Sequence, residues 1–568
     1  MSELAGETTD VRATVLDWLR RFERALSSGT GIADLFQPDA WWRDLLVITD
    51  DLRTFQGSDT IAANLKGEVS GLTVSDASHA PDGSFVQASI TFRTPVHRAE
   101  GILRLTTTDG HAWRAWTLLT AARELVGREE ATGRRRPHGA EARTSGGPTW
   151  AQTRAREREF LDDEPDVVVV GAGHSGLGLA ARLTRMGVRT LVVDHNDRVG
   201  DNWRRRYDSL RLHDPVWYDH LPYLPFPPSW PVFTPKDKLA DWLEHYVAAL
   251  DLDVWTGTSL TAATHDGSGW DLVLRRTDRS ERRLRPRHLV LATGVSGTEA
   301  RVPEIPGADD FAGTLCHSST FPGGAGFATR RAVVVGAGNS AHDIAQDLAE
   351  HGARVTMLQR FSTYVVSAEA SAMAMAGLYD ETGPATEVAD LLGASMPWPA
   401  AGDAQRAMTA RKAEKDSDLL AGLGRAGFRL NDGIDGTGAL MLFLQKGGGY
   451  YIDVGCSGLI ADGTITVRPG ADITRLTPTG VRLSDDSELE ADVVVLATGY
   501  HGMVETARSL LGDEIADRCG PVWGLDPEGE LRGVWRRTGQ PGLWFMGGNL
   551  AMARFYGRFL ALQLAADL

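Results

Sequence analysis

Three glycines and an acid form the first pattern that could carry chemistry. In "DVVVVGAGHSGLGLAARLTRMGVRTLVVDH", a continuous apolar run precedes Gly171, Gly173 and Gly176. A helical segment and a second apolar run follow, and the latter ends at Asp194. In such a turn the glycines allow a tight bend, close approach to a pyrophosphate and close helix packing, while the acid accepts hydrogen bonds from ribose hydroxyls. Because all parts occur in order, we expect a dinucleotide site, and Asp194 suits FAD.

The same order returns once, with a change of charge at its end. "RRAVVVGAGNSAHDIAQDLAEHGARVTMLQR" places Gly336, Gly338 and Ala341 in a GxGxxA turn. Arg360 stands at the end of its second strand, where a cation can meet a 2'-phosphate. A charge-assisted hydrogen bond contributes about 1.5 to 3 kcal/mol. The second site is therefore predicted to prefer NADPH to NADH; an exposed arginine at a strand end is the alternative.

The chain around these turns is expected to form an α/β protein with two Rossmann-like domains and an N-terminal α+β domain. "HLVLATG" from His288 and "DVVVLATGY" from Asp492 end in small-residue turns, which suggests strands that leave and re-enter the FAD domain around an inserted NADPH domain. The predicted parts are an N-terminal domain (1–125), a linker with a short helix (126–160), an FAD domain (161–322 and 492–568) and an NADPH domain (323–491) with a helical insertion at about 361–450.

The N-terminal region has its own helical and strand patterns. Val11, Val15, Trp18, Leu19, Phe22 and Leu26 form the stripe of an amphipathic helix. Strand-like runs follow, and the last two flank Asp109-Gly110, a hairpin signal. At "DAWWRDLLVITDDLRTFQG" the segment resembles the NTF2-like or SnoaL-like fold. We expect a docking or homodimer-forming module, with a separate enzymatic activity as the alternative.

Bulk composition limits the partners. The formal charge of -16 argues against nucleic acid, and we find neither a signal peptide nor an apolar stretch of the ~18 residues that a membrane span needs. A cytoplasmic location is the expectation. The three cysteines are widely separated, so no redox pair or zinc motif is available, and no metal site is expected.

Between the two turns, "FAGTLCHSSTF" spaces Phe311, Gly313, His317 and Phe321 as FxGxxxHxxx(F/Y). Together with the turns and "LATGY", this stretch resembles the flavin-containing monooxygenase family (class B flavoprotein monooxygenases), including its plant YUCCA branch. "VGDNWRRRYDSLRLH", which contains Trp203, resembles the family's segment beside the flavin. The resemblance implies that FAD is reduced by NADPH, that O2 adds to the flavin C4a carbon, and that one oxygen atom passes to a small organic substrate.

Several outcomes stay open on the sequence alone. The family oxygenates amine nitrogens and sulfides, and the YUCCA branch oxidises an aromatic 2-oxo acid. A Baeyer-Villiger ketone oxygenase is the alternative, although those enzymes typically carry Trp where this chain has Phe321. A flavin-binding sensor without turnover is the second alternative. A disulfide reductase is disfavoured because Asp197 to Leu212 contains no cysteine.

Candidate site residues follow from the same segments. His213 stands where other members have Asn and could donate a hydrogen bond to a peroxide oxygen, or only pack the flavin loop. Asn339 could orient nicotinamide or cap a helix. We expect His317 to be a hinge between the domains. The remaining predicted cofactor contacts are His317 itself, Ser340, Gly548 and Asn549.

Overall fold

The N-terminal part of the chain is a helix and a six-stranded sheet. The computed structural model describes residues 2–107, 112–139, 147–294 and 299–568 and begins with α1 (Ser2–Ser28). The sheet has the order β2-β1-β6-β5-β4-β3, in which only β1 and β6 run parallel. Its elements are β1 (Phe36–Leu45), β2 (Leu52–Gln56), α2 (Ser58–Asn64), β3 (Ser70–His79), β4 (Val86–Arg93), β5 (His97–Thr107) and β6 (Trp113–Leu125).

The predicted apolar stripe is the buried face of α1. Val15 and Trp18 are fully buried, and the Trp18 ring stacks on Phe22 with 4.9 Å between centroids. Strands β5 and β6 pair antiparallel, as the hairpin signal predicts, while the turn Asp109-Gly110 lies outside the described residues. The α+β arrangement agrees with the sequence, and the NTF2-like assignment stays a prediction.

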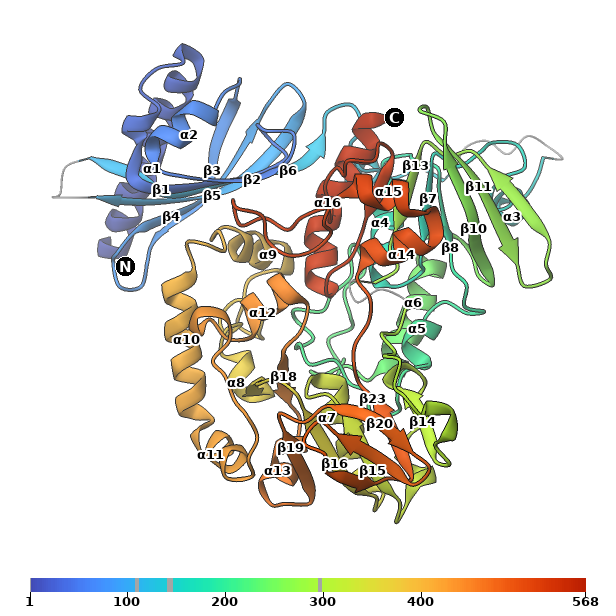
Figure 1. Cartoon of the computed structure of the whole chain (residues 1–568). Coiled ribbons are helices and arrows are strands. Elements are labelled where there is room, and N and C mark those ends of the chain that lie inside the picture. The colour runs from blue at the N-terminus through green and yellow to red at the C-terminus, as the bar shows by residue number, and fades with distance from the viewer. Residues whose placement is uncertain (1, 108–111, 140–146, 295–298) are drawn as a thin grey trace.

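The first glycine-rich turn belongs to a five-stranded, all-parallel sheet with the order β24-β13-β7-β8-β9. Beyond the linker, α3 (Trp150–Glu157) leads into this sheet. Its strands are β7 (Val167–Val170), β8 (Thr190–Val193), β9 (Asp253–Trp255), β13 (His288–Leu291) and β24 (Leu543–Phe545). Helices α4 (His174–Arg185) and α6 (Lys236–Ala249) and the antiparallel strands β10 (Thr258–His265), β11 (Trp270–Arg276) and β12 (Glu281–Leu284) surround it (Figure 1).

The second turn belongs to another parallel sheet, with the order β14-β23-β15-β16-β19. Its elements are β14 (Thr314–His317), β15 (Arg331–Val335), α7 (Asn339–Glu350), β16 (Arg354–Gln359), β19 (Ile465–Pro469) and β23 (Val493–Leu496). The predicted boundaries at 322/323 and 491/492 are therefore wrong, because β14 and β23 lie in this sheet and not in the first. The short apolar run Val493–Leu496 fits either sheet equally well in sequence, so only the strand pairing shows which sheet it joins.

The segment between β16 and β19 is mainly helical, as predicted. It contains β17 (Tyr364–Ser367), α8 (Ala368–Ala372), α9 (Thr386–Ala394), α10 (Gly402–Lys415), α11 (Ser417–Arg425), α12 (Ala439–Lys446), β18 (Tyr450–Asp453) and α13 (Cys456–Ala461). After β19 come the antiparallel strands β20 (Ile473–Thr477), β21 (Gly480–Leu483) and β22 (Glu488–Glu490). Among all described helices, none combines the length and apolar character needed to cross a bilayer.

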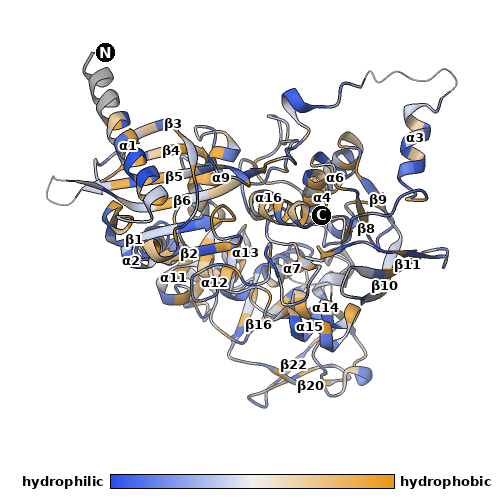
Figure 2. Ribbon diagram, turned by 90° about the horizontal axis from the view of Figure 1, so that it is seen from above, coloured by the Kyte–Doolittle hydropathy of each residue, from blue (hydrophilic) through white to orange (hydrophobic). Residues whose placement is uncertain are grey.

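The C-terminal helix joins the parts. After α14 (Met503–Leu511), α15 (Asp513–Cys519) and β24, the chain ends in α16 (Leu550–Asp567). This helix is buried along nearly all its length and lies between the N-terminal sheet and α4, where its ribbon is mostly orange (Figure 2). Because α16 is buried on both sides, its apolar residues lie all around the helix and not along one stripe.

Candidate active site

The first glycine turn is shaped by close backbone contacts. Gly171 has a φ of 114°, and a Cβ there would lie 2.5 Å from the carbonyl oxygen of Ala292, in the small-residue turn after β13. A Cβ on Gly176 would lie 2.0 Å from the Gly171 oxygen. A side chain at either position would collide with the backbone, so only glycine allows the chain to bend this tightly at the amino end of α4. Gly173 lies open on the cavity described below.

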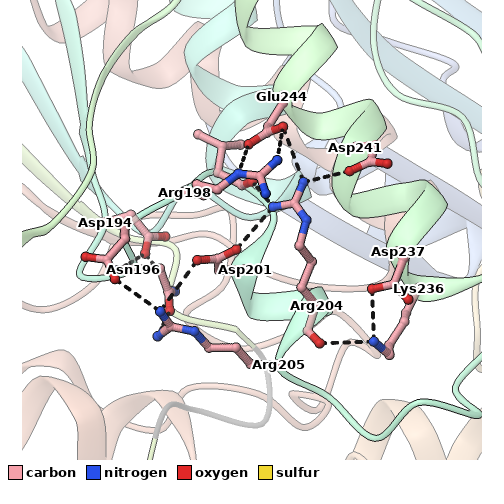
Figure 3. A network of polar contacts seen from close by, with 12 residues as sticks. Asp194, Asn196, Arg198, Asp201, Arg204, Arg205, Lys236, Asp237, Asp241 and Glu244 are labelled. Atoms are coloured by element: carbon pink, nitrogen blue, oxygen red, sulfur yellow. Dashed lines mark hydrogen bonds and ion pairs between the residues drawn. The ribbon is translucent and has the colours of Figure 1, made fainter.

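Asp194 ends β8 beside this turn, and its carboxylate is 8% exposed. It accepts hydrogen bonds from the backbone N–H of Ala172 at 2.7 Å and of Asn196 at 2.8 Å. Ion pairs fix the following loop to α6: Arg198 pairs with Glu244 at 2.7 Å and Arg204 with Asp241 at 2.9 Å (Figure 3). The segment that carries Trp203, including the short helix α5 (Asp201–Arg204), is thereby held against α6.

A cavity of about 1140 Å³ extends from the first turn to the helical insertion. The predicted site residues that line it are Gly171, Gly173, Asp194, Trp203, His213, Asn339, Gly548 and Asn549. Five buried polar atoms on its wall have no hydrogen-bond partner among the described residues: Trp203 Nε1, His213 Nδ1, Asp219 Oδ2, Thr293 Oγ1 and Thr506 Oγ1. Buried polar atoms are normally paired, so this wall suits a large polar ligand such as FAD.

His213 lines the cavity and interacts electrostatically with two carboxylates, Asp214 next to it in the chain and Asp343 of α7. Burial raises the pKa of Asp214 and of Asp343, and in both cases the charge of His213 opposes the rise. Asn549 caps α16 by accepting from the Met552 N–H at 3.0 Å, and its amide nitrogen lies 3.4 Å from Asp214 Oδ2. The histidine, the acid and the amide thus lie together, with a buried His213 nitrogen left for a ligand.

The second turn repeats the geometry of the first. Gly336 has a φ of 132°, and a Cβ there would lie 2.5 Å from the oxygen of Ala497, in the turn after β23. Gly338 precedes α7, and Ser340 lies half-buried in its first turn. Asn339 accepts a hydrogen bond from the Ile452 N–H at 3.0 Å, so its side chain ties α7 to β18. The N-cap position belongs to Gly338, so Asn339 does not cap this helix.

Arg360 is well exposed at the end of β16. Its side chain is 64% exposed and lies 3.4 Å from Asp472 Oδ2, while its guanidinium is centred 4.9 Å from the Phe361 ring. Phe361 is itself 70% exposed. A cation and an aromatic ring, packed on each other, are therefore accessible to solvent at the end of β16.

His317 ends β14 and does not line the cavity. Its Nε2 lies 3.0 Å from the Gly499 oxygen, and its Nδ1 accepts from the Ser319 N–H at 3.1 Å. Its ring packs edge-on against Tyr500 at 5.3 Å. The imidazole therefore fastens the "LATGY" turn, where the chain passes back toward the first sheet.

The sequence did not single out the residues that the insertion contributes to the cavity. Its apolar wall includes Met375, Leu378, Leu440 and Phe443. Asp390 on α9 forms a buried ion pair with Arg554 of α16 at 2.6 Å, and Lys412 on α10 faces the cavity. The predicted helical insertion at about 361–450 was the only signal for them, because a helix with charge on most faces does not show which face points inward.

The match to a known family lies in the part of the chain that contains the two glycine-rich turns. The family described as "Pyridine nucleotide-disulphide oxidoreductase" matches residues 168–373, a span that contains both turns. The only cysteine in this span is Cys316, so no redox pair accompanies the match.

Two plant enzymes are clear relatives in sequence. "Indole-3-pyruvate monooxygenase YUCCA1" of Oryza sativa subsp. japonica is 34% identical over 353 residues, covering 61% of this chain and 80% of the relative. "Probable indole-3-pyruvate monooxygenase YUCCA4" of Arabidopsis thaliana is 31% identical over 343 residues, covering 60% and 76%.

Solved structures share the fold. "OTEMO complex with FAD and NADP" has a TM-score of 0.53 at 18% identity, covering 71% of this chain and 84% of that one. Cyclohexanone monooxygenase with ε-caprolactone has a TM-score of 0.50 at 19% identity, covering 69% and 85%. At such identities the likeness concerns architecture alone.

Proposed function

The chain belongs to the flavin-containing monooxygenase family, the class B flavin monooxygenases, and on that premise we propose that it uses FAD, NADPH and O2 to oxygenate an aromatic 2-oxo acid. The enzyme class follows from the relatives. The substrate class is our inference. It rests on Lys412 in the cavity wall, which has no ion-pair partner among the described residues.

The first turn and the unpaired polar atoms would hold FAD. Gly173 and the amino end of α4 suit its pyrophosphate, Asp194 its ribose, and Trp203 Nε1 and Thr293 Oγ1 its other polar groups. Arg360 would bind the 2'-phosphate of NADPH, and the exposed Phe361 ring offers a face for adenine. When bound, the flavin takes up a hydride and activates O2, which is chemistry that no side chain supplies.

The insertion would exclude water from this reaction. Met375, Leu378, Leu440 and Phe443 of the insertion form an apolar part of the cavity wall. An apolar cover would keep water away from the reacting groups and hold the substrate beside the flavin. On the flavin side, the unpaired His213 Nδ1 is placed to donate a hydrogen bond to an oxygen atom in the cavity.

Lys412 supports an anionic substrate. It lines the cavity on α10 beside the neutral side chains of Gln405 and Thr409, and burial lowers its pKa. Asp416, one turn away, opposes this shift, but that carboxylate accepts bonds from Ser367 and forms no ion pair with Lys412. A half-buried cation without a paired anion is unfavourable unless a ligand supplies the charge.

Other lining residues of the cavity are acidic and disfavour a bound anion. Asp214 and Asp219 lie on the flavin side, and burial raises the pKa of both, most strongly for the 1%-exposed Asp219. Asp390 is already neutralised by Arg554. A substrate carboxylate would therefore lie at Lys412, which turns the uncharged part of the molecule, with its carbonyl carbon, toward the flavin.

The test is a substrate comparison on the purified yellow protein. A 2-oxo acid should react as RCOCOO⁻ + O2 + NADPH + H⁺ → RCOO⁻ + CO2 + NADP⁺ + H2O, so CO2 and the shortened acid are measured against NADPH consumed. Indole-3-pyruvate is compared with tryptamine and with methyl phenyl sulfide, in the wild type and in Lys412→Met. We expect the variant to raise the KM for the oxo acid severalfold and to leave the sulfide reaction unchanged. Turnover of the amine or sulfide but of no oxo acid would contradict the substrate class.

A further inference from the structure

One face of the N-terminal sheet is covered by the C-terminal part of the chain. Arg43 of β1 is 1% exposed and forms two hydrogen bonds of 2.7 Å with Glu530, whose side chain is 3% exposed. Thr54, the register partner of Arg43 on β2, donates to the same carboxylate at 2.7 Å. The loop that carries Glu530 thus fills this part of the sheet face.

The same arginine touches the wall of the cavity. Its third bond goes from Nη1 to the carbonyl oxygen of Ala394, at the end of α9, at 2.9 Å. Its guanidinium lies 5.6 Å from the ring centres of Trp398 and of Tyr556. Ala394, Trp398 and Tyr556 all line the cavity, so a single N-terminal side chain supports three of its wall residues from behind.

A second arginine supports the same wall segment. Arg104 of β5 donates to the Ser395 hydroxyl at 2.8 Å and reaches the Ser395 carbonyl oxygen at 3.4 Å. From the other side, Asp390 of α9 is held by Arg554. The stretch from α9 to Trp398 is therefore fixed between the N-terminal sheet and α16, and its position depends on both. In Figure 1 α9 lies below the N-terminal sheet, next to α16.

We propose that the N-terminal domain is a built-in wall of the monooxygenase cavity, with Arg43 and Arg104 as positioning residues for the segment from α9 to Trp398. In this role the domain needs no activity of its own, because its polar sheet face is used in packing. A displaced wall would admit water and let substrate leave, so that reducing equivalents are lost as NADPH + H⁺ + O2 → NADP⁺ + H2O2. The domain would thereby set the yield of oxygenated product per NADPH.

The experiment compares two ion pairs that join the same parts of the chain. Arg43→Gln/Glu530→Gln removes the buried pair without leaving a single buried charge, which a one-sided change would do. Arg53→Gln/Glu528→Gln removes a partly exposed pair of 2.6 Å at the same interface that touches no residue of the cavity. Arg104→Met is a third variant, because its partner Ser395 is neutral and no unpaired charge results.

We expect Arg43→Gln/Glu530→Gln and Arg104→Met to raise H2O2 released per NADPH and the substrate KM severalfold, with flavin content and anaerobic reduction by NADPH unchanged. The exposed-pair variant should behave as the wild type. Wild-type H2O2 yield in both buried variants, or an equal rise in the exposed-pair variant, would overturn the proposal. If one buried variant fails to fold, the other decides. Peroxide release is measurable without substrate, so this test stands even where no 2-oxo acid is turned over.

Discussion

Replacement of Arg360 by alanine tests whether the chain selects NADPH through one exposed cation. The guanidinium is 64% exposed, and its ion pair with Asp472 is long at 3.4 Å. Exposed pairs of this kind contribute about 0 to 1 kcal/mol, so the arginine loses little when it turns to a 2'-phosphate. A charge-assisted hydrogen bond to that phosphate contributes about 1.5 to 3 kcal/mol, which corresponds to about 10- to 150-fold in affinity.

The assay is steady-state oxidation of NADPH and of NADH by the wild type and by Arg360→Ala, at equal flavin content. We expect the KM for NADPH to rise by about 10- to 150-fold, while the KM for NADH, which lacks the phosphate, changes little. Asp472→Asn is the control: it frees the arginine and should leave the KM for NADPH unchanged or lower it. An equal rise for both nucleotides would refute the reasoning, because Arg360 would then support the turn and not the phosphate.

Two further outcomes concern histidines. His213→Phe should lower oxygenated product per NADPH by about two- to tenfold, the effect of one hydrogen bond, whereas His213→Gln keeps a donor and should lose less; equal product yields in both variants and the wild type would remove its role. His342 is fully buried, stacks on Tyr451 at 3.7 Å, and burial lowers its pKa to about 4. Between its ordinary pKa of about 6.5 and this value the unfolded chain binds a proton that the folded chain does not, so stability should fall by up to about 3 kcal/mol as the pH drops from about 6.5 to about 4. Urea unfolding at several pH values should give a smaller fall for His342→Phe, and an identical fall would contradict this origin.

The two dinucleotide turns could be predicted because their constraints are local. Gly171 and Gly336 each need a left-handed backbone and lie against a small-residue turn on the neighbouring strand, and both requirements are visible in the sequence. What failed was the assignment of the second "LATG" turn to the first sheet. Each glycine turn has its own partner turn, Ala292 for one and Ala497 for the other, so each of the two five-stranded parallel sheets has one such partner turn.

The cavity wall could not be predicted in the same way. Lys412 belongs to a helix with charge on most faces, and only its packing reveals that it points inward. Arg43 and Glu530 are 487 positions apart, and neither stands in a recognisable motif. Arg43 and Glu530 are in contact only because two domains pack together, and the residues at such an interface follow no pattern that can be recognised in the sequence.

The long separation of Arg43 from Glu530 also orders events during synthesis. A ribosome that adds about 5 to 20 residues per second takes about 25 to 100 s to make the 487 residues between them. Throughout that interval the nascent N-terminal sheet carries an arginine whose carboxylate partner has not yet been made, and β24 and α16 are later still. The N-terminal sheet therefore gains the carboxylate partner of Arg43 only after Glu530 has been made, so this part of the interface forms late in synthesis.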